Sequence, residues 1–312
     1  MELIRGIHNI KPRHHGCVLT IGNFDGVHRG HQAVLEQLKQ EGQRLGLPAM
    51  VMFFEPQPLE MFAKDQAPAR ITSLRDKVKY LAPACVDYLL CVKFNPRLAA
   101  NTPQDFIAEL LVEKLGMKLL IVGDDFRFGE GGQGDFKLLK QTGKQYGFQL
   151  VRASTFYEGK RRISSTAIRH ALDEEAFPLA ENLLGHPYSI SGRVVHGDAL
   201  GRTIGFPTAN LPLKCLVAPV QGVYVVKVYG LGVKPLPGLA NIGTRPTFDG
   251  MYQKLEVHLL DVRMDLYKRH INVVFCMKIR NEQRFSSLDE LKQQIGDDVV
   301  IARAFFGVKA LV

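Results

Sequence analysis

The residues best suited to chemistry are two histidines in the stretch Ile21-Gly22-Asn23-Phe24-Asp25-Gly26-Val27-His28-Arg29-Gly30-His31. An apolar run typical of a strand precedes this stretch, and a segment typical of a helix follows it. Glycines let the backbone approach a phosphate, and a helix start offers free N–H groups at the positive end of its dipole. His28 and His31 can therefore aim two donors at one phosphate group. The pattern predicts a site of nucleotidyl transfer, where charge grows on the α-phosphate oxygens.

Simpler explanations exist for the same loop. A glycine-rich loop after a strand is a weak signal when it stands alone. Two histidines three positions apart also occur as half of a metal site, or merely solvated. The strand before the loop and the helix after it favour the phosphate interpretation.

A second candidate is Ile163-Ser164-Ser165-Thr166-Ala167-Ile168-Arg169, which places three hydroxyl groups at a predicted helix start. One hydroxyl would suffice as an N-cap. Three hydroxyls, with an arginine one turn later, predict a second phosphate-binding segment. A simple cap remains the alternative.

The C-terminal half has two further candidates. Residues 196–210 hold three glycines in nine residues and then Thr208 and Asn210, which share one side if the chain is extended. Neutral oxygen ligands of this kind suit Mg²⁺, although a glycine-rich turn before an edge strand explains the pattern too. In Leu255–Leu259 the alternation puts Glu256 and His258 on one face, where Glu256 is either solvated or a general base at a rim.

The N-terminal elements that must position these residues alternate between strands and helices. Apolar strands are expected at 18–21, 49–54, 88–94, 118–122 and 148–151, and helices follow Ser73, Thr102 and Phe136. This alternation predicts an α/β, doubly wound parallel sheet, in which ligands lie beyond the carboxyl ends of the strands. The loops at 22–31, 54–58 and 123–129 fall at such ends.

Beyond Leu184 the pattern changes to short strands separated by turn residues. Strands are expected at 188–195, 222–229, 239–242, 254–260 and 271–279, with an amphipathic helix from about Ser287. We expect a small antiparallel barrel or sandwich with a terminal helix. This change of pattern predicts two domains, residues 1–184 and residues 185–312.

Bulk properties exclude several classes of protein. The 312 residues are 46% hydrophobic and 23% charged, without an apolar run long enough to span a bilayer. Five cysteines are scattered without a C-x-x-C pair, which argues against a zinc site or disulfide framework and favours the cytoplasm. The net charge of +9 fits nucleic acid or phosphorylated ligands, but the longest basic run, at 160–162, is too short to indicate a nucleic-acid surface. The oligomeric state stays open.

Four N-terminal motifs, at 22–31, 54–58, 122–129 and 163–169, resemble those of the bacterial bifunctional riboflavin kinase/FMN adenylyltransferases, also called FAD synthetases. The resemblance implies that His28 and His31 contact the ATP phosphates and stabilise the transition state. It implies a nucleotide- and phosphate-binding set of Gly22, Asn23, Phe24, Asp25, Gly26, Gly30, Ser164, Ser165, Thr166 and Arg169. It places Phe54, Pro56, Pro58, Asp125, Phe126 and Phe128 on the flavin side.

The segment Pro207-Thr208-Ala209-Asn210 is similar to the hallmark of the riboflavin kinase domain. By this resemblance Thr208 and Asn210 bind Mg²⁺ with ATP, and Glu256 takes the proton of the ribityl 5′-hydroxyl. Gly201 and Gly205 lie in a segment that would cover the phosphates. The sequence departs from the family at Lys268, where glycine is expected.

The resemblance therefore predicts two activities: riboflavin is phosphorylated to FMN by ATP, and FMN is adenylylated to FAD with release of pyrophosphate. The signature of His28 and His31 also fits a nucleotidyltransferase for another small substrate. The second domain with Thr208 and Asn210 argues against that alternative. A non-catalytic protein that binds nucleotides or nucleic acid through its +9 charge is the remaining rival.

Overall fold

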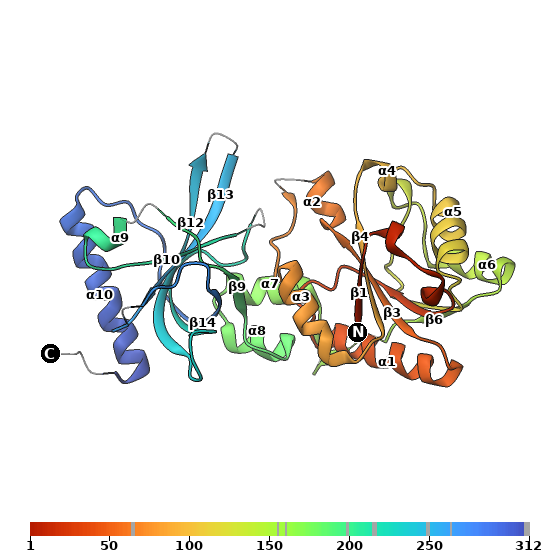
Figure 1. Cartoon of the computed structure of the whole chain (residues 1–312), viewed down its shortest axis with the longest axis horizontal. Coiled ribbons are helices and arrows are strands. Elements are labelled where there is room, and N and C mark those ends of the chain that lie inside the picture. Colours follow the sequence, from red (N-terminus) through yellow and green to blue (C-terminus); the bar gives the residue numbers. More distant parts are fainter. Residues whose placement is uncertain are drawn as a thin grey trace. The chain divides into compact units, whose positions relative to one another are not determined.

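The computed structural model describes residues 1–63, 66–154, 156–159, 161–197, 200–213, 217–247, 250–262 and 264–308. The chain forms two compact units, residues 1–68 with 77–165, and residues 69–76 with 166–312 (Figure 1). Among the described residues, no helix is long and apolar enough to cross a membrane.

The first unit is built on a parallel six-stranded sheet in the order β1-β4-β3-β2-β5-β6. Every neighbouring pair in this sheet is parallel, so all the carboxyl ends meet at one edge. Its strands are β1 (Glu2–Arg5), β2 (Val18–Ile21), β3 (Ala49–Glu55), β4 (Tyr88–Lys93), β5 (Leu119–Val122) and β6 (Gln149–Arg152). The N-terminal strand β1 is an addition to the strands expected from the sequence.

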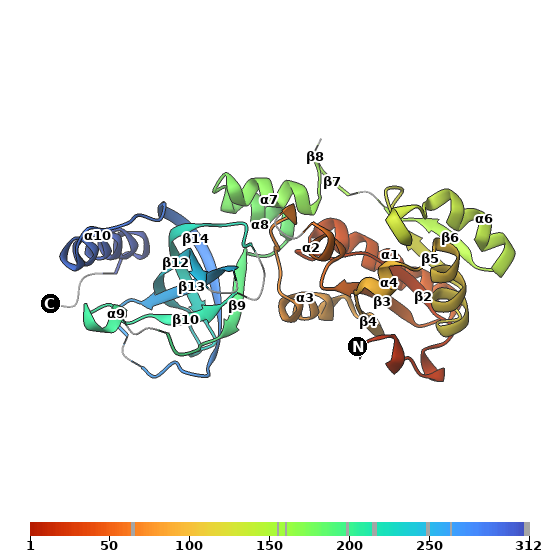
Figure 2. The same cartoon turned by 90° about the horizontal axis from the view of Figure 1, so that it is seen from above.

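Helices connect these strands along the chain and pack on the sheet (Figure 2). They are α1 (Arg29–Leu45), α2 (Pro58–Phe62), α3 (Leu74–Leu81), α4 (Pro96–Ala99), α5 (Pro103–Asp105), a π-helix at Phe106–Lys114, and α6 (Phe136–Tyr146). Alternate strand residues such as Leu19 and Met50 pack against Ile107 and Leu139, whereas α1 covers the other face of β2 and β3. Because both faces are buried, the doubly wound sheet is confirmed.

A short hairpin, β7 (Tyr157–Glu158) with β8 (Arg161–Arg162), follows β6. Helices α7 (Ser165–Asp173) and α8 (Phe177–Leu184) come next, and α8 ends at Gly185 in the left-handed conformation (φ 79°). The end of α8 confirms that the helical pattern stops at Leu184.

The second unit contains a nearly closed antiparallel barrel in the order β10-β13-β12-β11-β14-β9. Its strands are β9 (Ser189–Arg193), β10 (Ala209–Pro212), β11 (Gly222–Tyr229), β12 (Leu236–Thr247), β13 (Gly250–Leu259) and β14 (His270–Arg280), and α9 (Leu200–Thr203) lies between β9 and β10. The Val195 N–H donates to the Asn210 carbonyl at 2.9 Å and brings the two ends of the sheet together.

The terminal helix α10 (Leu288–Phe306) begins at Ser287, whose hydroxyl accepts the Glu290 N–H. Val299 and Ala302 of α10 pack with Val223, Val225 and Leu239 of the barrel. The barrel and its terminal helix are thus confirmed. Lys268, where the resemblance leads us to expect glycine, has a φ of 63°, in the left-handed region that favours glycine.

Candidate active sites

The first candidate site is a cavity of about 360 Å³ at the carboxyl edge of the parallel sheet. The loop after β2 forms one wall, with Gly22, Phe24, His28, Gly30 and His31. This loop takes left-handed conformations at two non-glycine residues, Phe24 (φ 48°) and Val27 (φ 42°), both of which are buried. Burial of these two side chains holds the backbone in a conformation that costs free energy locally.

His28 is the N-cap of α1, and its Nδ1 accepts the backbone N–H of His31 at 3.2 Å. A neutral imidazole that accepts at Nδ1 carries its proton on Nε2. The rings of His28 and His31 are stacked, with centroids 3.6 Å apart and planes 15° apart. A phosphate in this cavity would therefore meet both imidazoles side by side.

His31 is held in its neutral form. Burial, and then the charges of His28 and Lys77, keep the pKa of His31 well below its ordinary value of 6.5. The His31 Nδ1 atom is buried and has no hydrogen-bond partner among the described residues. A phosphate anion close to this ring would reverse the electrostatic balance and favour its protonation.

Gly30 has a steric role in this arrangement. A Cβ at Gly30 would lie 3.1 Å from the His28 Nδ1 and 3.3 Å from the Ile163 carbonyl oxygen. A methyl group at this position would require the His28 ring or the segment before α7 to shift by a few tenths of an ångström.

Ser164 and Ser165 line the same cavity. The Ser165 hydroxyl donates to the Asp25 carbonyl at 2.9 Å and ties the start of α7 to the loop after β2. Thr166 is exposed, and the Arg169 Nε donates to the Ala69 carbonyl at 2.6 Å. In this conformation, Thr166 and Arg169 do not line the cavity.

Other residues expected in the first site are more scattered. Asp125 lines the cavity and accepts from Arg162 Nη2 at 3.3 Å. Asn23 is exposed, while Asp25 and Gly26 are buried within the loop. The expected flavin-side residues outside the cavity lining are Phe54, Pro56, Pro58, Phe126 and Phe128. Phe126 and Phe128 stack at 5.6 Å and pack with the sheet core.

Arg162 is a cavity residue that the sequence did not single out. It belongs to the basic run 160–162, which the sequence showed only as charge. The hairpin β7–β8 is what turns it towards Asp125. The structure places Phe156 on the same wall, and the Arg29 guanidinium lies 5.3 Å from the centroid of the Phe156 ring.

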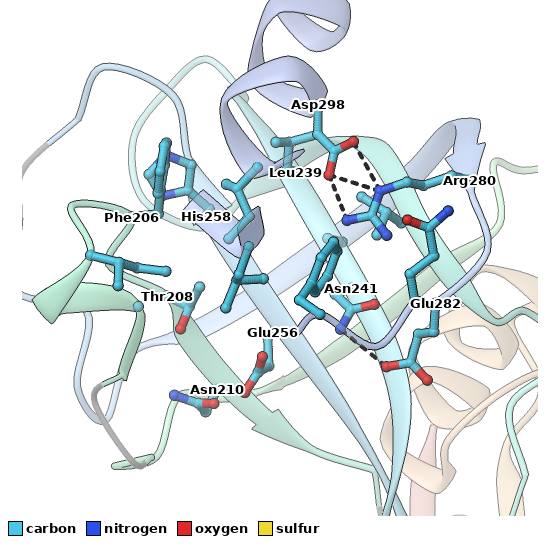
Figure 3. A pocket seen from close by; sticks show the side chains of 18 residues that line it. Phe206, Thr208, Asn210, Leu239, Asn241, Glu256, His258, Arg280, Glu282 and Asp298 are labelled. Carbon is cyan, nitrogen blue, oxygen red and sulfur yellow. Dashed lines mark hydrogen bonds and ion pairs between the residues drawn. The ribbon is translucent and has the colours of Figure 1, made fainter. Parts of the chain in front are cut away.

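The second candidate site is a cavity of about 250 Å³ in the barrel, beside α9 and α10 (Figure 3). Gly201, Thr208, Asn210 and Glu256, which the resemblance to the riboflavin kinase domain assigns to one site, all line this cavity. Of the residues expected there, Gly205 (φ 92°) does not line the cavity. A Cβ at Gly201 would lie 2.4 Å from the Phe206 carbonyl oxygen, so glycine is required for the turn to close.

Strand register explains the polar wall of this cavity. Asn210 of β10 lies opposite Glu256 of β13, and Asn241 of β12 lies opposite Glu256 on its other side. The same row continues through Val223 of β11 to Arg280 of β14. The sequence could not show this row because it joins residues up to 70 positions apart.

Glu256 is oriented by Lys254, whose Nζ lies 2.8 Å from Glu256 Oε1. His258, one pair further along β13, is within 2.9 Å of the Pro207 carbonyl oxygen through its Nδ1. Burial lowers the pKa of His258, although the contact with the Pro207 carbonyl opposes this shift. Glu256 is the acidic residue of the row.

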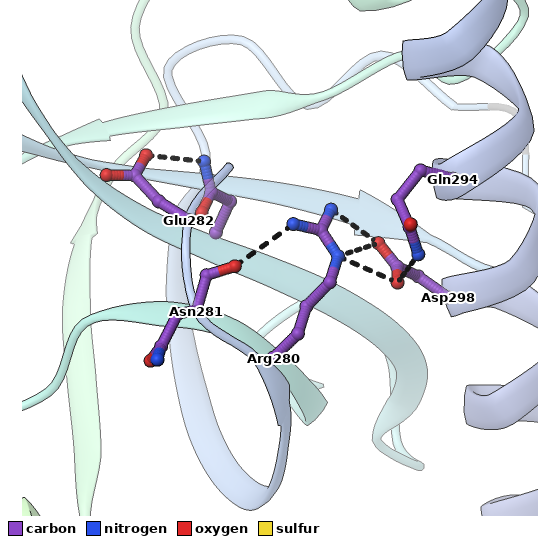
Figure 4. A network of polar contacts seen from close by, with 6 residues as sticks. Arg280, Asn281, Glu282, Gln294 and Asp298 are labelled. Carbon is purple, nitrogen blue, oxygen red and sulfur yellow. Dashed lines mark hydrogen bonds and ion pairs between the residues drawn. The ribbon is translucent and has the colours of Figure 1, made fainter. Parts of the chain in front are cut away.

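Arg280 is fixed at the far end of the row (Figure 4). Its Nε and Nη2 donate to the two carboxylate oxygens of the buried Asp298 on α10, at 3.0 Å and 2.8 Å. Its Nη1 donates to the Asn281 carbonyl at 3.1 Å, and Gln294 donates to Asp298 at 3.2 Å. A bidentate pair of this kind is rigid, so α10 determines where the Arg280 guanidinium lies.

A magnesium ion would fit next to Asn210. The Asn210 Oδ1 atom is buried and has no hydrogen-bond partner among the described residues. Thr208 adds a hydroxyl oxygen to the same cavity. Oxygen donors of these types are the ligands that Mg²⁺ prefers, together with phosphate and water.

A parallel sheet with paired histidines at its carboxyl edge, together with a barrel in which Glu256 lies between two asparagines, fits an enzyme that transfers nucleotidyl and phosphoryl groups. A FAD synthetase family model matches residues 10–167, and a riboflavin kinase family model matches residues 184–306. The bifunctional riboflavin kinase/FMN adenylyltransferase of Escherichia coli (strain K12) is 65% identical to this chain over 309 residues, which is 99% of each chain. The chain belongs to this family of bifunctional riboflavin kinase/FMN adenylyltransferases.

Two further comparisons also cover nearly the whole chain. The relative of the same name from Haemophilus influenzae is 51% identical over 306 residues, 98% of this chain and 99% of the relative. A crystal structure described as a macrolide-efflux protein from Streptococcus pneumoniae superposes with a TM-score of 0.74 and 30% identity, covering 97% of this chain and 99% of that one. Kinases and adenylyltransferases of these families use ATP.

Proposed function

We propose that this chain phosphorylates riboflavin in the barrel and adenylylates the resulting FMN at the parallel sheet. The observation that supports this most directly is that the two units each have a separate cavity, with a different constellation in each. We assign the activities to residues 1–184 and 185–312. The start of the riboflavin kinase match at residue 184 supports this division, whereas the compact units divide the chain at residue 165 and group α7 and α8 with the barrel.

In the kinase step, the ribityl 5′-oxygen of riboflavin attacks the γ-phosphorus of ATP. A new O–P bond forms, the bond from the γ-phosphorus to the bridging oxygen breaks, and ADP leaves. Glu256 accepts the proton of the hydroxyl. Thr208 and Asn210 would hold Mg²⁺, which neutralises charge on the β- and γ-phosphates when it is bound. Gly201 and Gly205 lie in the segment that would cover the phosphates.

In the adenylyl step, a phosphate oxygen of FMN attacks the α-phosphorus of ATP. The bond from the α-phosphorus to the oxygen that bridges to the β-phosphorus breaks, and pyrophosphate leaves. His28 and His31 donate hydrogen bonds to the α-phosphate oxygens as their charge grows. Gly22, Phe24 and Gly30 let the backbone approach the nucleotide, and the remaining loop residues Asn23, Asp25 and Gly26 set the shape of the loop.

We further propose that Ser164, Ser165, Thr166 and Arg169 bind ATP phosphates, and that Phe54, Pro56, Pro58, Asp125, Phe126 and Phe128 form the flavin side. Placement of Ser164, Ser165 and Asp125 in the cavity supports their roles. Phe54, Pro56 and Pro58 lie at the carboxyl end of β3, and Phe126 and Phe128 follow β5, so these five residues belong to the same edge of the sheet as the cavity. A cytoplasmic location is also proposed, supported by the free thiols of Cys17, Cys85, Cys91 and Cys276.

A chromatographic assay tests the proposed function. Purified full-length protein is incubated with riboflavin, ATP and Mg²⁺, and FMN and FAD are followed over time. We expect FMN first and then FAD, and no product when Mg²⁺ is chelated by EDTA. FMN without FAD would refute the adenylyl assignment and point to another acceptor. Neither product from folded protein would refute the proposed substrate.

A further inference from the structure

The strand order of the barrel gives Glu256 a different neighbour on each side. Glu256 lies between Asn210 on β10 and Asn241 on β12, and directly opposed residues in such pairs stand about 5 Å apart. With Asn210 on the nucleotide side, as proposed above, the side of Glu256 that is left for the alcohol substrate is that of β12. Asn241 is the polar residue of that strand in the cavity wall (Figure 3).

The lining beyond Asn241 agrees with this placement. Val223 follows Asn241 in the same row of the barrel. The cavity also includes the apolar side chains of Leu239, Phe285, Leu291 and Ile295. A flat aromatic ring system packs well against such an apolar surface, whereas the nucleotide phosphates need the glycines and oxygen donors near Asn210.

The amide of Asn241 has a defined orientation. Its Nδ2 donates to Glu282 Oε1 at 3.3 Å. An ionised carboxylate can only accept hydrogen bonds, so Glu282 selects the amide nitrogen and leaves the oxygen on the other side. That oxygen, Oδ1, is buried and has no hydrogen-bond partner among the described residues. An unmatched acceptor next to the proposed base calls for a donor supplied by the ligand.

We propose that Asn241 is a substrate-positioning residue of the kinase. Its Oδ1 accepts a hydrogen bond from the secondary hydroxyl beside the reacting primary hydroxyl of the ribityl chain. Glu282 acts through Asn241 by fixing the amide. This inference rests on the proposed kinase function and adds a determinant of specificity. The site requires a polyol chain, so a flavin whose side chain has the primary hydroxyl but lacks the neighbouring secondary hydroxyl is a poor substrate.

The test compares riboflavin with 4′-deoxyriboflavin, which retains the reacting 5′-hydroxyl but lacks its neighbour. For the full-length protein we expect kcat/KM to fall about tenfold or more with the deoxy substrate, because a site built to bind a hydroxyl group rejects the analogue that lacks it. In Asn241→Ala, kcat/KM for riboflavin should fall about tenfold, and the ratio of kcat/KM for riboflavin to that for the deoxy substrate should fall to roughly one. Glu282→Ala should reduce the preference in part.

Asn272 provides a matched control. It lies on β14 outside the cavity lining, and its Oδ1 is likewise buried without a partner among the described residues. Asn272→Ala should retain the full preference for riboflavin. If Asn241→Ala does not fold, the exposed Glu282 supplies the second variant, and FMN adenylylation shows whether the rest of the protein is intact.

The outcomes separate the inference from the function beneath it. Retention of the preference in Asn241→Ala, or in Glu282→Ala when Asn241→Ala does not fold, would overturn the inference. A protein without any preference between the two flavins would overturn it as well, although riboflavin would still be a substrate. Failure to phosphorylate either flavin would instead refute the proposed kinase function.

Discussion

The imidazole of His28 stacks on that of His31 at a centroid distance of 3.6 Å, and its Nδ1 caps the helix through the His31 N–H. One ring thus fixes the backbone that places the other. The pair is a single unit, so loss of either ring disturbs both. Glu256 belongs instead to the barrel, where it lies between Asn210 and Asn241 and forms an ion pair with Lys254.

The two activities should separate by mutation. We expect His31→Ala to lower FAD formation from FMN by about 100-fold or more, because a donor to the developing charge is lost. FMN formation from riboflavin should be unchanged. Glu256→Gln should show the reverse pattern when each substrate is offered alone. Loss of both activities in either folded variant would contradict the division between domains.

Stability should depend on the protonation of His31. Burial, followed by the charges of His28 and Lys77, places the pKa of His31 in the folded chain well below 6.5. The unfolded chain therefore binds a proton at a pH where the folded chain does not, and stability is lost as pH falls below about 6.5. From pH 7.5 to 5.5 the wild type should lose about 1 kcal/mol more than His31→Gln.

Urea denaturation at the two pH values measures this difference, with the exposed His15→Gln as the control. The control should follow the wild type. An equal acid-side loss in wild type and His31→Gln would show that His31 is not held neutral in the folded protein.

Gly30 should be intolerant of even one methyl group. Gly30→Ala brings a Cβ to 3.1 Å from His28 Nδ1, so the ring must shift. Because small displacements of positioning groups slow catalysis strongly, FAD formation should fall at least about tenfold. Gly232→Ala, where no atom lies within 4 Å of the added Cβ, should behave as wild type. Steady-state rates of both variants decide the matter, and normal FAD formation by Gly30→Ala would refute the steric argument.

The pair of Arg280 and Asp298 should stabilise the kinase domain. Asp298 is almost fully buried, so Asp298→Asn leaves the Arg280 charge without its counter-ion and should cost roughly 3–5 kcal/mol of unfolding free energy. The more exposed pair of Arg303 and Asp261 offers the comparison. Asp261→Asn should cost less than about 1 kcal/mol. Calorimetry of the full chain measures both, and equal effects would argue against the buried pair as a structural anchor.

Asn210 should determine the magnesium requirement. We expect Asn210→Ala to raise the Mg²⁺ concentration for half-maximal FMN formation about tenfold, since one oxygen donor is removed. Asn272→Ala should leave that concentration unchanged. A reduced maximal rate at an unaltered Mg²⁺ requirement would mean that Asn210 serves the nucleotide and not the metal.

Local sequence patterns were sufficient for most elements of the fold, but not for β1 or the hairpin β7–β8. The capping serine predicted at Ser73 accepts the Asp76 N–H at 3.1 Å, and the strand predicted at 222–229 is β11 with the same bounds. Alternation and capping depend on near neighbours in the chain, so they are visible without a structure. The motif residues His28, His31, Thr208, Asn210 and Glu256 could be chosen for the same reason.

What the sequence determined by itself is therefore the set of elements, their order and the groups capable of chemistry. Only the tertiary structure decided which of those groups meet. Asn241 joins Glu256 through the register of β12 and β13, and Asp298 reaches Arg280 from a separate helix. Register and helix docking arise from hydrogen bonds and packing between segments that are distant in the chain. For that physical reason no local sequence pattern could identify Asn241, Glu282 or Asp298 as residues of the site.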